Sequence, residues 1–200
     1  MPRPARYDND QIVAAAAAVA AKHGPSRATI ARIAGALSAP TGSIYHRFTS
    51  RDVLLGEVWL RTVEKFQGDF AVHLQAPDAK VAGLNAAHSV TRWVRKHPQE
   101  ARILMLYRSE DFFAGTWPKE MSKRALKLRA EMSGALRRFC RRLLGKTDRA
   151  SMSAVTFALV EAPYAAVRKY VKAGEPPPPF ANDLIEATYH AVLALAGVRW

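Results

Sequence analysis

The placement of proline is the feature that most constrains the fold of this chain. Prolines fall between segments of helical periodicity, at positions 25, 40, 77, 98, 118 and 176–179. Proline lacks a backbone N–H and has a fixed φ, so it disturbs helices least when it stands between them. Runs of alternating β-branched residues bounded by turns, which would indicate strands, are absent from the sequence. The sequence therefore predicts an all-α fold.

The intervals between these breaks predict about nine helices. The first begins at Asp8 or Asn9, which are good N-cap residues, and ends at Gly24. Short second and third helices follow near 28–37 and 41–48, and Ser50 is expected to cap a long fourth helix. The later helices are expected at about 79–96, 99–113, 118–144, 148–173 and 181–197, with Asp148 and Asn182 as caps and a kink at Pro163.

The lengths of these helices predict two parts. The first three are short and closely spaced, whereas the later ones are long. We expect a three-helix N-terminal head, residues 1–50, on a larger helical body, residues 51–200. With 49% hydrophobic and 24% charged residues, the 200-residue chain has the composition of a folded protein with a sizeable core.

Composition also limits the cellular compartment and the class of binding partner that we expect for this protein. A single cysteine, Cys140, excludes an intramolecular disulfide and any zinc site that needs several cysteines. Because no stretch approaches about 18 uninterrupted apolar residues, we expect a soluble cytoplasmic protein without a membrane segment. The net charge of +13 favours a polyanionic partner, with nucleic acid as the first candidate.

The charge is not spread evenly along the chain. Residues 1–51 contain seven Lys+Arg and two acidic residues, whereas residues 119–142 contain nine and two. An apolar stripe in the second segment is expected to face inward, leaving the basic residues on a solvated face; it comprises Met121, Ala125, Leu128, Met132, Leu136, Phe139 and Leu143. A second nucleic-acid site there is the alternative.

Residues 27–48 fit a helix-turn-helix, in which the second helix enters the major groove of DNA. Such a helix needs small residues for close approach, hydroxyl groups and phosphate-binding groups. The segment 41–48 supplies all three. Ile44 and Phe48 are expected to face inward, and the side chains expected to face outward are Thr41, Ser43, Tyr45, His46 and Arg47.

Residues 24–55 resemble, without gaps, the DNA-binding head of the tetracycline-repressor (TetR) family. The resemblance is carried by Gly24, Thr29, Ile33-Ala34, Gly42, Tyr45-His46-x-Phe48 and Ser50-Arg51-Asp52-x-Leu54-Leu55. Ser38 stands where the family often has glycine, which is acceptable if the turn avoids positive φ. Pro40 and Thr41 stand where the family often has a polar N-cap and a lysine.

The resemblance implies roles in DNA binding for individual residues. Thr29, Tyr45, His46 and Arg51 are expected to contact phosphates, and Thr41, Gly42 and Ser43 are expected to meet base edges. Arg47 is a further candidate on the same outward face. Arg3 and Arg6 precede the head and are candidates for a minor-groove arm, with a disordered solubilising tail as the alternative.

The resemblance also implies two functions for the body, dimerisation and effector binding. Helices 148–173 and 181–197 are more apolar than one buried face requires, and we expect them to form a homodimer; covering the core of one monomer is the alternative. An effector cavity is expected among the middle helices. Its candidate lining residues are Trp59, Val63, Phe66, His88, Arg92, Trp93, Met105, Arg108, Phe112, Trp117, Met121, Glu161, Tyr164 and Arg168.

The resemblance thus implies a dimeric, ligand-responsive repressor that a small molecule releases from a near-palindromic operator in double-stranded DNA. The alternatives are a basic architectural DNA-binding protein without a ligand and a small-molecule-binding protein with a vestigial head. The chain lacks the G-x-S-x-G, H-E-x-x-H, Walker and Rossmann motifs, so we expect no enzyme activity, no cofactor and no metal.

Overall fold

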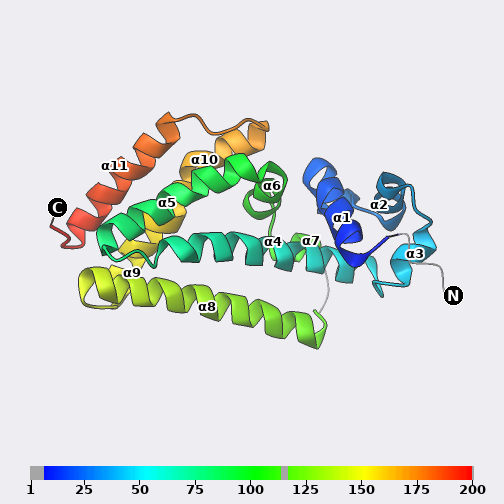
Figure 1. Ribbon diagram of the computed structural model, residues 1–200, viewed down its shortest axis with the longest axis horizontal. Helices are drawn as coiled ribbons and strands as arrows, with labels where there is room; N and C mark the ends of the chain where they lie inside the picture. The colour runs from blue at the N-terminus through cyan, green and yellow to red at the C-terminus, as the bar shows by residue number, and fades with distance from the viewer. Residues whose placement is uncertain (1–6, 114–116, 200) are drawn as a thin grey trace.

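The computed structural model describes residues 7–113 and 117–199, which form an elongated molecule built from helices (Figure 1). No strand occurs among these residues, and the predicted all-α fold is confirmed. The elements in chain order are α1 (Asn9–His23), a 3₁₀ turn (Pro25–Arg27), α2 (Ile30–Leu37), α3 (Thr41–Tyr45), α4 (Arg51–His73), α5 (Ala79–Lys96), α6 (Pro98–Leu106), α7 (Ser109–Phe112), α8 (Lys119–Leu144), α9 (Arg149–Thr156), a π-helical segment (Phe157–Glu161), α10 (Ala162–Ala173) and α11 (Phe180–Leu195).

Helices α4 and α8 run side by side along the length of the molecule (Figure 1). At one end, α1, α2 and α3 gather around the first turns of α4. Toward the other end, α5 packs on α4, and α10 and α11 pack on α5 and on each other, with α9 near the end of α8. The helix-turn-helix therefore lies at the tip of the molecule opposite α11.

Local capping explains why most helices begin where the sequence predicts. The Asp8 carboxylate accepts the Gln11 backbone N–H at 2.8 Å, and the Gln11 side chain accepts the Asp8 N–H at 3.0 Å. This reciprocal capping box fixes the start of α1. Ser50 and Asp148 cap α4 and α9, as predicted.

Two predicted helix boundaries are wrong. The expected helix 99–113 is divided into α6 and α7, because the backbone is extended at Tyr107 and Arg108 and the Asp111 carboxylate accepts the Arg108 N–H at 2.7 Å. Asn182 does not cap the last helix. It lies inside α11, because the chain already turns at the prolines and the Pro179 carbonyl accepts the Asn182 N–H at 2.8 Å.

The predicted irregularity at Pro163 takes the form of a π-helical segment, Phe157–Glu161, directly before it. Proline cannot donate the hydrogen bond that a regular helix requires, and a widened turn accommodates the missing donor. The continuous helical stretch Arg149–Ala173 is, within the described residues, the one long and apolar enough to cross a membrane, with a mean hydropathy of 1.3 over its most apolar 18 residues. Core and interface helices of soluble proteins share this property.

Buried side chains form two hydrophobic cores. The body core contains Phe70, Trp93, Phe139, Leu159 and Tyr189 together with smaller residues from α4, α5, α8, α10 and α11. The head core is built from α1, α2, α3 and the first turns of α4, and it also contains Ile103 of α6 and Phe112 of α7. The head core is therefore completed by two residues of the body.

Gly83 allows α5 to lie against α11. The ring of Tyr189 packs over Gly83, and the Tyr189 hydroxyl donates to the Lys80 carbonyl at 2.8 Å. A Cβ atom at position 83 would collide with Tyr189 and would lie 2.7 Å from Cζ of Phe139. Two buried aromatic rings thus occupy the space that any other side chain would need.

Candidate nucleic-acid interface

The first helix of the motif is fixed at both ends by local contacts. Thr29 caps α2, and its Oγ1 accepts the Arg32 backbone N–H at 3.3 Å. Ile30, Ile33 and Ala34 are buried against α1, which leaves the N-terminus of α2 at the surface. A free helix N-terminus of this kind favours an anion such as a phosphate.

Ser38 ends α2 in the left-handed conformation, with φ 52° and ψ 40°. The Ala39 N–H donates to the Ala34 carbonyl at 2.9 Å, as in a Schellman turn. The condition stated for serine at this position, a turn without positive φ, is therefore not met. Ser38 carries a backbone strain that glycine would avoid.

The recognition helix α3 is anchored by two side chains. Ile44 is fully buried and Phe48 is 7% exposed, so both face inward as predicted. Tyr45 is 56% exposed, and Thr41, Gly42, His46 and Arg47 are also exposed. The sequence-predicted outward face is therefore present at the surface, except that Ser43 is half-buried.

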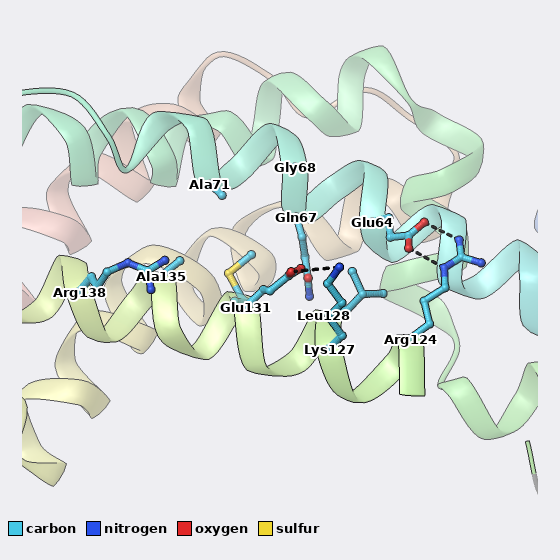
Figure 2. Close-up of a pocket in the computed structure, with 11 residues that line it drawn as sticks. Glu64, Gln67, Gly68, Ala71, Arg124, Lys127, Leu128, Glu131, Ala135 and Arg138 are labelled. Atoms are coloured by element: carbon cyan, nitrogen blue, oxygen red, sulfur yellow. Dashed lines mark hydrogen bonds and ion pairs between the residues drawn. The ribbon is translucent and has the colours of Figure 1, made fainter. Parts of the chain in front are cut away.

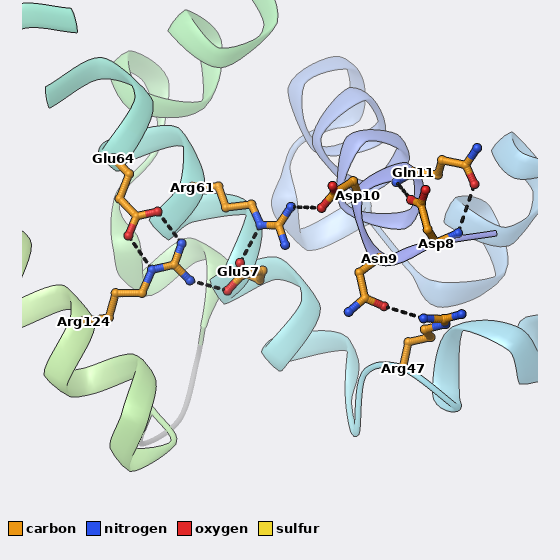
Figure 3. A network of polar contacts seen from close by, with 9 residues as sticks. All are labelled: Asp8, Asn9, Asp10, Gln11, Arg47, Glu57, Arg61, Glu64 and Arg124. Carbon is orange, nitrogen blue, oxygen red and sulfur yellow. Dashed lines mark hydrogen bonds and ion pairs between the residues drawn. The ribbon is translucent and has the colours of Figure 1, made fainter. Parts of the chain in front are cut away.

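Three residues of this face have environments that affect what they offer to DNA. The Ser43 hydroxyl donates to the Pro40 carbonyl at 2.6 Å, so it can offer DNA only acceptor lone pairs. No described atom lies within 4 Å of the position that a Cβ on Gly42 would take, which leaves room for a base edge. Arg47 donates to Oδ1 of Asn9 at 3.3 Å, which ties the end of α3 to α1 (Figure 3).

Arg51 has internal partners instead of an outward position. Its guanidinium donates to the carbonyls of Pro25 and Ala28, with Nε 3.0 Å from the latter, and to Asp52 at 2.9 Å. These contacts brace the turn before α2 against the start of α4. The geometry thus shows Arg51 holding the motif together; the phosphate contact that the resemblance implies stays a prediction.

The two arginines proposed as a minor-groove arm, Arg3 and Arg6, lie outside the described residues. The residues that sequence reasoning missed are on the first turn of the head. The Tyr7 hydroxyl donates to the Ser38 carbonyl at 3.1 Å, and Asn9 binds Arg47. No local pattern signals these contacts, since the partners are 31 and 38 positions apart.

A groove of about 750 Å³ lies between α4 and α8, next to α9, and is the candidate effector site. Three predicted lining residues, Trp59, Val63 and Trp117, contribute to it. Sequence reasoning did not assign the other lining residues to a pocket: Leu60, Gln67, Ser109, Ser122, Ala125, Leu126, Leu128, Arg129, Met132, Ser133, Leu136, Met152 and Thr156. The apolar stripe of α8 was the feature of the sequence that could have indicated these lining residues. It was interpreted as a buried face, because grooves and cores are lined by the same kinds of side chain.

The aromatic and sulfur-containing candidates that do not line this groove are packed elsewhere. Phe66 stacks against Trp93, with ring centroids 5.0 Å apart, inside the body core. Met105 is buried in the same core, and Phe112 in the head core. Met121 packs over Gly56, where α8 approaches α4.

The polar candidates are also dispersed. His88 Nε2 lies 3.3 Å from the Asn182 carbonyl oxygen, Arg92 donates to the Asn85 carbonyl at 3.0 Å, and the Tyr164 hydroxyl donates to the Met105 carbonyl at 2.7 Å. The remaining three candidates are exposed, namely Arg108, Glu161 and Arg168.

A second cavity of about 540 Å³ lies on the other side of the contact between α4 and α8 (Figure 2). Gln67, Leu128 and Met132 line both cavities and separate them. Its lining is more polar: Arg124 faces Glu64 at one end, and Arg138 lies at the other. The side chains of Gln67, Leu128 and Met132 are therefore the layer between the two cavities.

The N-terminal part of the chain has a clear family match. Residues 12–58 match the model for bacterial regulatory proteins of the tetR family. This range contains the whole helix-turn-helix, the bracing Arg51 and the first turns of α4. No match was found among curated proteins.

Solved structures share the fold over nearly the whole chain. The fatty acid degradation regulator FadR from Bacillus halodurans superposes with a TM-score of 0.68 at 17% identity, over 96% of this chain and 100% of that one. The TetR-family regulator PfmR from Thermus thermophilus gives a TM-score of 0.70 at 18% identity, over 94% and 96%. FadR from Bacillus subtilis, solved in complex with stearoyl-CoA, gives 0.65 at 15%, over 94% and 97%.

Proposed function

We propose that the chain acts as a dimeric repressor of the tetR family that a small molecule releases from its operator. Residues 12–58 match the tetR-family model, and the fold is shared with solved TetR-family regulators. The observation that carries this proposal is the exposed face of α3. Thr41, Gly42, Tyr45 and His46 project from a helix held by the buried Ile44. This arrangement leaves hydroxyl, imidazole and backbone groups free to meet DNA.

Exposed apolar side chains support dimerisation through α9, α10 and α11. Phe157 is 44% exposed, and Phe180, Leu184 and Leu195 of α11 are 60%, 46% and 92% exposed. Only 33% of the most apolar part of the stretch Arg149–Ala173 is buried within one chain. A second copy of these helices would cover this surface and hold two heads about one DNA turn apart, on a near-palindromic operator in the cytoplasm.

The effector that fits the groove best carries a long apolar chain. Leu60, Val63, Met132 and Leu136 give the groove an apolar wall, and Arg129 stands at its polar edge. The FadR of Bacillus subtilis was solved with stearoyl-CoA, which has an acyl chain and an anionic head. We extend this class of ligand to the present chain, with the acyl chain in the groove.

Selection of duplexes from a random DNA pool, followed by fluorescence anisotropy, tests the DNA-binding part. We expect a near-palindromic selected site, with affinity that falls as salt rises. Tyr45→Phe and His46→Ala should weaken binding to all sequences alike, whereas Thr41→Ala should change the preferred bases. Equal affinity for selected and random duplexes would replace this proposal by an architectural DNA-coating role.

Titration of the protein–DNA complex with stearoyl-CoA tests the ligand part, with coenzyme A as the acyl-free control. We expect release of DNA by the acyl compound alone. Val63→Trp fills the groove and should abolish release while DNA binding persists. Val72→Trp is the matched control, because Val72 is 64% exposed on the same helix and lines neither cavity. Release that is unaffected by Val63→Trp would locate the effector elsewhere.

A further inference from the structure

A continuous chain of ion pairs connects α8 to the DNA-binding head across α4 (Figure 3). Arg124 of α8 donates to Glu64 and to Glu57 of α4, with Nε–Oε1 of 2.5 Å and Nη1–Oε2 of 2.7 Å. The second oxygen of Glu57 accepts Nε of Arg61 at 2.5 Å. Arg61 then reaches across to α1, where Nη1 lies 2.5 Å from Oδ1 of Asp10.

Glu57 is the central residue of this chain. Its side chain is only 17% exposed, and its two carboxylate oxygens are divided between Arg124 and Arg61. The carboxylates raise the pKa of both guanidiniums above the usual arginine range, so neither charge titrates. Glu57 thus holds two permanent cations that belong to different parts of the molecule.

No other hydrogen bond or ion pair leads from α8 toward the head within residues 7–113 and 117–199. The Arg142 guanidinium donates to the Leu74 carbonyl, at the opposite end of α4. The pair of Lys127 and Glu131 stays within α8. Arg124 is therefore the polar connection through which the position of α8 reaches the first half of α4.

The position of Arg124 links a movement of α8 to the contacts of the head. Arg124 and Glu64 line the 540 Å³ cavity at the contact between α4 and α8 (Figure 2). If α8 moves away from α4 there, Arg124 leaves Glu57 and frees one carboxylate oxygen. Arg61 can then bind Glu57 through Nε and Nη2, as arginine does in bidentate pairs, and this turns the guanidinium and redirects Nη1, the nitrogen that holds Asp10.

We propose that Arg124 and Arg61 are positioning residues for DNA binding, which fix the orientation of the head by sharing Glu57 and by holding Asp10. This inference rests on the proposed function, because its readout is operator binding by a dimer. These ion pairs set the angle of α1 on α4, and hence the separation of the two recognition helices in the dimer. Loss of the ion pairs widens the range of half-site separations that the dimer accepts.

Two variants break the chain of ion pairs at its opposite ends. Arg124→Gln removes the connection at α8. Asp10→Asn removes it at α1, where Asp10 is 83% exposed and the change does not threaten folding. Lys127→Gln is the matched control, since it removes one positive charge from α8, one turn beyond Arg124, at a residue whose ion pair, with Glu131, lies within α8.

Anisotropy titrations use the duplex selected by the wild-type protein and duplexes with one base pair added to or removed from its centre. Each chain-breaking variant should weaken binding to the selected duplex about 1.4- to 5-fold, the range for a partly exposed ion pair. Each should also reduce the preference for the selected spacing over the altered ones. The double variant should lose no more than the stronger single variant, because the residues act as one unit.

The outcomes separate this inference from the proposed function. If the wild-type protein selects no duplex, the proposed function itself fails. If it selects one and Asp10→Asn keeps the full spacing preference, the positioning role is overturned. Equal weakening at every spacing, or an equal effect of Lys127→Gln, would also overturn it, because lost stability or lost charge would then account for the result.

Discussion

Replacement of Ser38 by glycine tests the strain at the end of α2. Ser38 has φ 52°, and a residue with a Cβ in this left-handed region costs roughly 1–2 kcal/mol. Glycine removes that cost but gives the unfolded chain more freedom, which lowers stability by about 0.4–1 kcal/mol. The Ser38 hydroxyl makes no hydrogen bond within the described residues, so nothing else is lost. With the middle of each range, about 1.5 and about 0.7 kcal/mol, the net expectation for Ser38→Gly is a gain of about 0.8 kcal/mol.

For a chain of this size, that gain corresponds to a rise in melting temperature of about 1–4 °C, measured by circular dichroism at 222 nm. Ser38→Ala is the control. It removes the hydroxyl but keeps the Cβ, and its melting temperature should not rise. A lower melting temperature for Ser38→Gly, or an equal gain for Ser38→Ala, would refute the assignment of strain to the backbone of this residue.

Three further predictions concern the body. Gly83→Ala should lower the free energy of unfolding by roughly 1–3 kcal/mol in urea titrations, because its Cβ would meet Tyr189 and Phe139; an unchanged midpoint would contradict the close approach of α5 and α11. Burial lowers the pKa of His97 from 6.5, so the unfolded chain binds this proton more readily. The stability that neutral His97 provides should therefore be lost as pH falls below 6.5, and His97→Gln should flatten a plot of unfolding free energy against pH in that range. Burial also raises the pKa of the Cys140 thiol, which should react with iodoacetamide far more slowly in the native than in the unfolded protein, as mass spectrometry will measure.

Features encoded over a few residues were predictable from the sequence. Asp8, Ser50 and Asp148 are caps because their side chains reach a backbone N–H three residues ahead. Ile44 and Phe48 face the core because a spacing of four places them on one side of α3. The outward face of the recognition helix followed from the same periodicity.

Features that depend on distant parts of the chain were not predictable. The guanidinium of Arg51, at the start of α4, is held by the carbonyls of Pro25 and Ala28, and no pattern near Arg51 in the sequence indicates these contacts. Arg47 finds Asn9 for the same reason, a contact made only by folding. The lining of the groove was largely missed, because hydrophobic periodicity identifies a buried face without indicating whether the opposite helix fills it.

The shared core of the head has a consequence for building hybrid regulators. Ile103 and Phe112 belong to the body by sequence, yet they are part of the head core, and their helices pack against α1 and α4. A hybrid that exchanges residues 1–50 alone joins one protein's head to another protein's α6 and α7, and leaves either a void or a clash at the junction. A working graft must carry the facing residues of α4, α6 and α7 together with the head. Two of these residues, Ile103 and Phe112, lie more than 50 positions beyond the end of the head at residue 50. The residues that must be transferred together to carry DNA specificity then form a three-dimensional patch and not a contiguous segment.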